Sequence, residues 1–197
     1  NLSQARGSME EARSILPRIE NQNIAGIVHS SIAQYEVLQG NLAAAVHGYT
    51  EAVRLSRAGG NLPHLAVHLT SLAWAQLTMG SLLPARDSLA EGLALAEKLG
   101  SPRTRAILLQ VFADLSLTEG ALEDARQQIE ESIAIFEANG ETWNLGESYL
   151  AASHIAFERG ELSRSEDLIE TSIRWNLDLE QTETEALAHA FRGRRAH

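Results

Sequence analysis

The sequence contains no cysteine among its 197 residues, and this absence removes several kinds of chemistry. Without cysteine there is no disulfide bond, no thiolate nucleophile and no cysteine-ligated zinc. No apolar run reaches the roughly 18 residues that a membrane-spanning helix needs, and the N-terminus lacks the basic-then-apolar pattern of a secretion signal. We therefore expect a cytoplasmic protein that has no membrane segment.

Basic residues are scarce, because the formal net charge of the chain is -10. Proteins that bind DNA or RNA need clustered Lys and Arg to displace the counterions of the phosphates. The composition therefore excludes a direct nucleic-acid partner. The acidity increases towards the C-terminus, and we interpret it as a solvated surface, the alternative being a docking patch for a basic partner.

Catalytic motifs are also missing. The chain has no Gly-rich phosphate loop, no nucleophile elbow and no paired His-Glu zinc signature. His64 and His68 lie four residues apart, so they can share one face of a helix towards a metal, but a metal site needs a third ligand and none stands at a suitable spacing. We predict a non-catalytic chain without a cofactor or metal, in which these histidines are surface or interface residues.

What the sequence does contain is a repeat. Apolar residues make up 44% of the chain and are dominated by Ala and Leu, which is typical of an all-α protein. Glycines recur every 40 residues, at Gly40, Gly80, Gly120 and Gly160. Each is followed by a leucine, at Leu42, Leu82, Leu122 and Leu162, and then by a small residue, at Ala45, Ala85, Ala125 and Ser165. Large and small residues then alternate at helical spacing, which predicts that neighbouring helices approach closely along this face.

A second amphipathic segment precedes each of these glycines, over residues 27–39, 67–79, 107–119 and 147–159. Its small column is Ala33, Ala73, Ala113 and Ser153. The residue before this column is large in three repeats, as Ile32, Leu72 and Phe112, whereas the fourth repeat has Ala152. We therefore expect looser packing in the fourth repeat.

The breaks between helices follow the same period. Each glycine of the first column is expected to end one helix in a left-handed backbone conformation, and Gly60, Gly100 and Gly140 are expected to end the other. Prolines stand where a helix begins or in its first turn, at Pro63, Pro84 and Pro102, where a missing amide hydrogen is tolerated.

These columns resemble the tetratricopeptide (TPR) family over essentially the whole chain. The resemblance implies a right-handed α-solenoid of antiparallel helix pairs. Two features depart from the family pattern: the period is longer than the usual length of about 34 residues, and the early aromatic residue is replaced by His29, Leu69 and Leu109, with Tyr149 in the fourth repeat. The longer period is similar to that of kinesin light chain TPRs and of the sensor segments of MalT-like bacterial regulators.

We predict one array with the following divisions. Full repeats occupy residues 21–60, 61–100, 101–140 and 141–180, with a half-repeat at 1–20 that supplies a second helix and another at 181–197 that supplies a first helix. An uncapped array exposes an apolar end. The half-repeats therefore suggest a segment of a longer protein, or a homodimer in which the two ends pair.

The resemblance also implies that the first helices of the repeats line a concave groove. The residues that it would direct into this groove are Ser30, Gln34, Val37, Thr70, Trp74, Leu77, Gln110, Asp114, Leu117, Leu150, His154 and Phe157. An exposed Trp beside polar groups suits a peptide anchor, the alternative being that Trp74 packs on the preceding repeat. The basic residues of the TPRs that clamp acidic C-terminal peptides are absent from these positions.

Three functions were compared for this array. The favoured hypothesis is a scaffold-type interaction module that holds a peptide or helix from a partner protein or from the same polypeptide. The alternative is an effector-sensing, regulatory segment of a bacterial signalling or transcriptional protein, in which binding favours one of two states of the array. A stand-alone enzyme is the third class, and the missing motifs argue against it.

Overall fold

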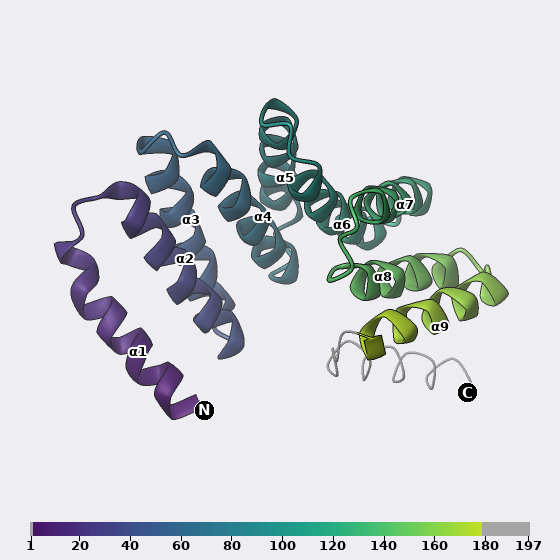
Figure 1. Cartoon of the computed structure of the whole chain (residues 1–197), viewed down its shortest axis with the longest axis horizontal. Helices are drawn as coiled ribbons and strands as arrows, with labels where there is room; N and C mark the ends of the chain where they lie inside the picture. Colours follow the sequence, from purple (N-terminus) through teal and green to yellow (C-terminus); the bar gives the residue numbers. More distant parts are fainter. Residues whose placement is uncertain (1, 179–197) are drawn as a thin grey trace. The chain divides into compact units, whose positions relative to one another are not determined.

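The computed structural model describes residues 2–178, which are almost entirely helical. The order is α1 Leu2–Ile15, a short 3-10 helix Leu16–Arg18, α2 Gln22–Leu38, α3 Leu42–Ala58, α4 Leu62–Thr78, α5 Leu82–Lys98, α6 Pro102–Thr118, α7 Leu122–Ala138, α8 Leu145–Glu158 and α9 Leu162–Asp178. The predicted all-α solenoid of antiparallel helix pairs is confirmed (Figure 1). The half-repeat predicted at 181–197 lies outside the described residues.

The chain divides into two compact units, Asn1–Gly100 and Ser101–His197. In the first unit, α2 packs against α3, α3 against α4, and α4 against α5. In the second unit, α6, α7, α8 and α9 pack in succession in the same way. Among the described residues, no helix is long and apolar enough to cross a membrane.

Left-handed glycines end the helices, as predicted. Gly40 has φ 76, and the amide of Asn41 donates to the carbonyl of Glu36 at 2.8 Å. This bond spans the glycine and is typical of a Schellman C-cap. Positive φ recurs at Gly60, Gly80, Gly100, Gly120, Gly140 and Gly160. The repeat period is therefore set in the backbone by residues that tolerate this conformation.

Most first helices of the repeats begin at a polar cap. The side chain of Asn21 accepts from the amides of Asn23 and Ile24, and Asn61 accepts from the amide of His64 at 3.2 Å. Ser101 caps α6 in the same way. The fourth repeat differs, because α8 begins only at Leu145 and the preceding turn leaves Trp143 62% exposed.

The small columns are the most deeply buried positions of the array. Ala45, Ala85, Ala125 and Ser165 are 0% exposed, and so are Ala33, Ala73, Ala113 and Ser153. The leucine column is less buried than its place in the pattern suggests: Leu42, Leu82 and Leu122 are half-buried and Leu162 is exposed. Each leucine is the first residue of its helix, so its side chain lies at the edge of the packed face.

Several buried serines donate their hydroxyls to a carbonyl of the neighbouring helix. Ser132 on α7 donates to the carbonyl of Ala106 at 2.8 Å, and Ser172 on α9 donates to Gly146 at 2.6 Å. Ser165 donates to the carbonyl of Ser153 at 2.8 Å. These bonds leave the small residues polar without an unsatisfied buried hydroxyl.

We predict that enlarging a small-column residue destabilises the first unit. Ala85→Leu should reduce the free energy of unfolding by about 1–3 kcal/mol, because the added carbons force neighbouring side chains from their rotamers. Denaturant titration followed by circular dichroism measures this change. Ala94→Leu, at an exposed position of the same helix, is the matched control and should cost less than about 0.5 kcal/mol. Equal costs at the two positions would contradict the assignment of the packed face.

Candidate functional site

The predicted groove residues of the first unit lie on α2 and α4, which are the first helices of their repeats. Trp74 is 39% exposed, so more than a third of its surface is open to solvent. Gln34 occupies the equivalent position on α2 and is exposed, and its Oε1 accepts a hydrogen bond from the Tyr49 hydroxyl at 2.8 Å. We call the positions one residue past the small column of each first helix, which are Gln34 and Trp74 in this unit, the first-helix line. In this unit the line contains one exposed aromatic side chain and, on the other first helix, one oriented amide.

Other predicted groove residues of the first unit are committed to packing. Thr70 is buried, and its hydroxyl donates to the carbonyl of Ala66 at 2.9 Å. Val37 packs against the core cluster that contains Tyr49 and Leu72. Ser30 and Leu77 are half-buried. The surface of the line is therefore carried mainly by Gln34 and Trp74.

In the second unit, the equivalent positions are Asp114 on α6 and His154 on α8. Leu117 and His154 are brought together, since both border a hollow of about 430 Å³ that is also lined by Gly120, Leu122 and Glu158. Gln110 and Phe157 are half-buried. Leu150 is buried and packs against Ile169 of α9, so its side chain belongs to the core and is not open to a partner.

Asp114 is the electrostatically unusual member of the line. Burial raises the pKa of this carboxyl to about 7, and the negative charge of Glu147 at the start of α8 raises it further in the same direction. An ordinary Asp would be fully ionised at neutral pH. Asp114 is instead held close to half-protonation, next to a second carboxylate from the neighbouring first helix.

The histidine pair has a structural explanation. The rings of His64 and His68 lie 5.9 Å apart, but His68 is buried and its Nδ1 is 2.9 Å from the Ser56 hydroxyl of α3. Burial lowers the pKa of His68. His64 Nδ1 lies 3.0 Å from Oδ1 of its own cap residue, Asn61. Within residues 7–176, whose side chains are described, no three His, Asp or Glu residues group as metal ligands.

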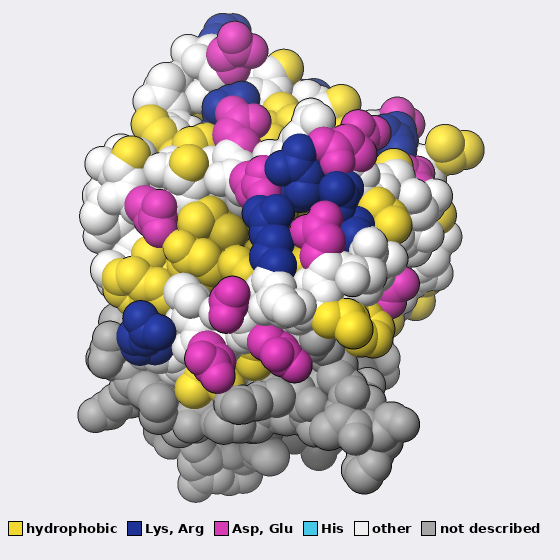
Figure 2. Space-filling view, turned by 90° about the vertical axis from the view of Figure 1, so that its right-hand side faces the viewer, with side chains coloured by type: hydrophobic (Ala, Val, Ile, Leu, Met, Phe, Trp, Pro, Cys, Tyr) yellow, Lys and Arg dark blue, Asp and Glu magenta, His cyan; other side chains and the backbone are white. Residues whose placement is uncertain are grey.

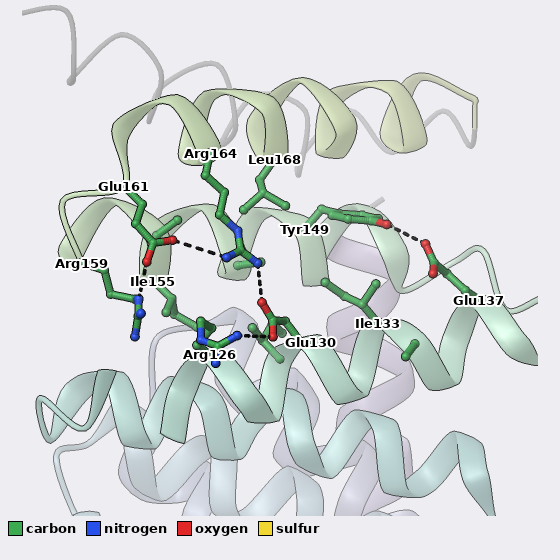
Figure 3. Close-up of a pocket in the computed structure, with 14 residues that line it drawn as sticks. Arg126, Glu130, Ile133, Glu137, Tyr149, Ile155, Arg159, Glu161, Arg164 and Leu168 are labelled. Carbon is green, nitrogen blue, oxygen red and sulfur yellow. Dashed lines mark hydrogen bonds and ion pairs between the residues drawn. The ribbon is translucent and has the colours of Figure 1, made fainter. Parts of the chain in front are cut away.

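A pocket of about 200 Å³ opens between α7, α8 and α9, and sequence analysis did not place it. We call it the α8 pocket. Its apolar floor is formed by Ile129, Ile133, Ala152, Ile155, Ala156 and Leu168 (Figure 3). Ala152 and Ala156 are two residues away from His154 along α8, a rotation of about 200° in each case. The pocket and the first-helix line therefore lie on opposite sides of α8.

A closed ring of ion pairs stands at one end of this pocket. We call it the ion ring, and its members are Glu123, Arg126, Glu130, Arg164, Glu161 and Arg159, each paired with the next and Arg159 again with Glu123. The Arg126–Glu130 and Arg159–Glu123 pairs are 2.6 Å long, whereas Arg164 and Glu161 are 3.5 Å apart. The ring thereby joins α7, the end of α8 and the start of α9 (Figure 3).

The pairing changes the titration of the ring residues. Hydrogen bonds from Arg126, Gln127 and Arg159 lower the pKa of Glu123 to about 2. Hydrogen bonding to Arg159 lowers the pKa of Glu161, and bonding to Glu161 and Glu123 raises the pKa of Arg159. Glu123 and Glu161 therefore stay ionised at physiological pH. The ring contains three arginines and three glutamates, so its formal charges balance.

The opposite end of the pocket is closed by Tyr149 and Glu137. The Tyr149 hydroxyl donates to Glu137 Oε1 at 2.6 Å, and burial followed by this bond raises the tyrosine pKa to about 12. In space-filling view, apolar surface borders closely interleaved basic and acidic side chains on this side of the molecule (Figure 2). The pocket is thus an apolar recess with a charged but balanced rim.

One sequence signal pointed to this pocket. Ala152 replaces the large residue of the other repeats, and the looser packing expected there coincides with the recess that Ala152 lines. For the ion ring, the helical spacing of Glu123, Arg126 and Glu130 is a signal for pairing within α7. The pairs between segments had no such signal, because their side chains meet only after the segments have packed.

Comparison with known families gives a match over residues 1–176 to the MalT-like TPR region. The chain belongs to the MalT-like TPR family. This match confirms the predicted TPR resemblance. Of the two groups that the repeat period suggested, kinesin light chains and MalT-like regulators, the family match is to the MalT-like group. No curated protein sequence matches this MalT-like TPR chain.

Solved structures with the same fold share little sequence with the MalT-like TPR chain. BtubC from P. vanneervenii has a TM-score of 0.74 at 16% identity, over 91% of this chain and 77% of that protein. The Rap protein complexed with Competence and Sporulation Factor has a TM-score of 0.83 at 12% identity, over 95% and 53%. A STAND protein with a tetratricopeptide repeat sensor from Pyrococcus horikoshii has a TM-score of 0.74 at 16% identity, over 93% and 29%. The chain thus spans about half of the Rap protein and less than a third of the STAND protein.

We predict that Asp114 lowers stability as the pH rises. Its raised pKa means that the native state holds a proton which the unfolded state releases at the ordinary value of 3.8, so stability falls between about pH 4 and 7. Asp114→Asn removes this loss. The melting temperature of the variant should exceed that of the wild type by a margin that grows from pH 5 to pH 8.

The matched control is Asp87→Asn, an exposed aspartate on α5. Its melting temperature should follow the wild type at each pH. A margin for Asp114→Asn that stays constant across the pH range would contradict the role assigned to carboxyl burial.

Proposed function

We propose that this chain is a non-catalytic, cytoplasmic interaction module that binds a peptide or helix of a partner protein along the first-helix line. The observation that carries the proposal is the exposed indole of Trp74. An aromatic side chain on a rigid helix loses little conformational entropy on binding, and it supplies the large apolar contact typical of interface anchors. Gln34 is the equivalent residue of the preceding first helix, and its side-chain oxygen is oriented by Tyr49.

The polar members of the line restrict the chemistry of the partner. Gln34 bonds through its oxygen to Tyr49, which leaves its amide hydrogens directed to an acceptor on the partner. In the second unit, Glu147 is close enough to Asp114 to raise its pKa, so a further anionic group would be repelled there. A partner with a neutral or basic segment fits these charges better than an acidic tail does. The proposal also includes the repeat divisions predicted from the sequence, with full repeats at residues 21–60, 61–100, 101–140 and 141–180.

Similar proteins give support at the level of fold. The Rap protein of the comparison is complexed with Competence and Sporulation Factor. A helical repeat array of this kind therefore accommodates a binding partner, and the same fold is available here. The identity between the two chains is low, so the partner chemistry has to come from the residues of this chain.

Effector sensing is the second candidate. Membership of the MalT-like TPR family and the fold shared with the sensor-containing STAND protein both favour it. In this case a ligand would bind two states of the array with different affinity and shift their populations. Binding that changes protease sensitivity or radius of gyration would separate this candidate from a passive scaffold.

We predict that peptide binding depends on Trp74. A random peptide library displayed on phage should yield sequences that bind the wild-type chain, and Trp74→Ala should weaken each of them by about tenfold or more, since interface anchors commonly contribute 2 kcal/mol or more. Fluorescence anisotropy with synthetic versions of the selected peptides measures the dissociation constants.

Trp143→Ala is the matched control, because Trp143 is an exposed tryptophan outside the first-helix line. Its affinities should equal those of the wild type. Peptides that lose affinity equally in both variants would count against the first-helix line. Peptides that bind Trp74→Ala as tightly as the wild type would also count against it.

A further inference from the structure

Several side chains that line the α8 pocket differ from their counterparts in the first unit, and two of them are alanines. Two periods of 40 residues relate Ala152 to Leu72 and Ala156 to Gln76. Leu72 is buried in the core cluster with Tyr49 and Val53 of α3. Gln76 accepts a hydrogen bond from Ser88 of α5 at 2.9 Å. In the first unit, these two positions are therefore occupied by a packed leucine and by an amide bonded to a hydroxyl. The pocket residue Ile129 also has a larger counterpart, the buried Tyr49.

In the second unit, the same positions border open volume. Ala152 and Ala156 lie one turn apart on α8, and Leu168 takes the position equivalent to Ser88. An aliphatic residue at 168 also removes the hydroxyl that would bond across this space. The result is a recess of about 200 Å³ with an apolar floor. An apolar cavity of about 150 Å³ is sufficient to bind one benzene ring.

The rim determines what kind of apolar group fits. Arg126, Arg159 and Arg164 border the recess, and all three are paired within the ion ring. A balanced rim does not attract a net ionic charge. Guanidinium groups do associate with aromatic faces, and this interaction is stronger than their contact with aliphatic groups of equal size.

We infer that the α8 pocket is a binding site for a small, uncharged aromatic molecule, held by the aliphatic floor and the arginines of the ion ring. This site lies on the opposite side of α8 from the first-helix line, so it goes beyond the peptide binding proposed above and does not depend on it. The aromatic ring of the ligand occupies the volume that Leu72 and Gln76 fill in the first unit.

Binding of 5-fluoroindole followed by ¹⁹F NMR tests this inference. A fragment of this size should bind with a dissociation constant on the order of 1 mM. Selective methyl labelling of Ile and Leu should place the largest shifts at Ile129, Ile133 and Leu168, which line the floor. Shifts confined to other methyl groups, or the absence of binding up to the solubility limit, would overturn the assignment.

Two variants transfer the residues of the first unit into the pocket. Ala152→Leu and Ala156→Gln, separately and together, should weaken 5-fluoroindole binding by about tenfold or more while the circular dichroism spectrum is retained. The control is Ala94→Leu, an equal enlargement at an exposed position of α5, and it should bind as the wild type does. Unchanged affinity in both pocket variants would refute the site.

The preference for an aromatic ligand is tested separately. Methylcyclohexane should displace 5-fluoroindole less effectively than toluene does, although the two are of similar size. Arg164→Gln removes one guanidinium group from the rim, and it should reduce this difference between the two competitors. Equal competition by both molecules in the wild type would contradict the role given to the arginines.

Discussion

Close approach of neighbouring helices through small side chains is the constraint on which this array depends. In the first unit, a β-carbon added at Gly48 of α3 would lie 2.8 Å from the β-carbon of Ala33 on α2. Ala33, Ala45, Ala73 and Ala85 are all fully buried for the same reason. Because contacts are this short, the large residues beside them, such as Tyr49 and Leu89, have defined spaces to fill. The first-helix line and the α8 pocket are both positioned by this interlocking.

The repeat period, the left-handed glycines and the small columns were predictable from sequence because each depends on one residue type at one helical position. Gly40 and Ala45 illustrate this, since only a residue without a bulky side chain meets the backbone or packing requirement. The burial of Thr70 and Leu150 was not predictable in the same way. Both lie one turn before a line position, and their exposure depends on how far the neighbouring second helix reaches over them.

The candidate sites show a second limit of sequence patterns. Asp114 was placed on the first-helix line by its register, but its raised pKa comes from burial and from Glu147, which is 33 positions later. The ion ring goes further, since its members come from α7, the end of α8 and the start of α9. The pairs within α7 follow helical spacing, whereas the pairs between segments follow no period of the sequence. The single alanine that marks the fourth repeat was visible, whereas the rim around it required the packed structure.

The hollow beside Ala152 and Ala156 shows how a stack of equivalent units can diversify. Its helices are the counterparts of α3, α4 and α5, and alanines stand where the first unit has Leu72 and Gln76. Each repeat contacts only its neighbours, so replacing large side chains by small ones in one repeat leaves distant repeats unaffected. A solenoid in this sense contains a series of equivalent spaces between helices, each of which can be filled or left open by the local side chains. A binding pocket can therefore form in one repeat while the packing of the other repeats maintains the stability of the array.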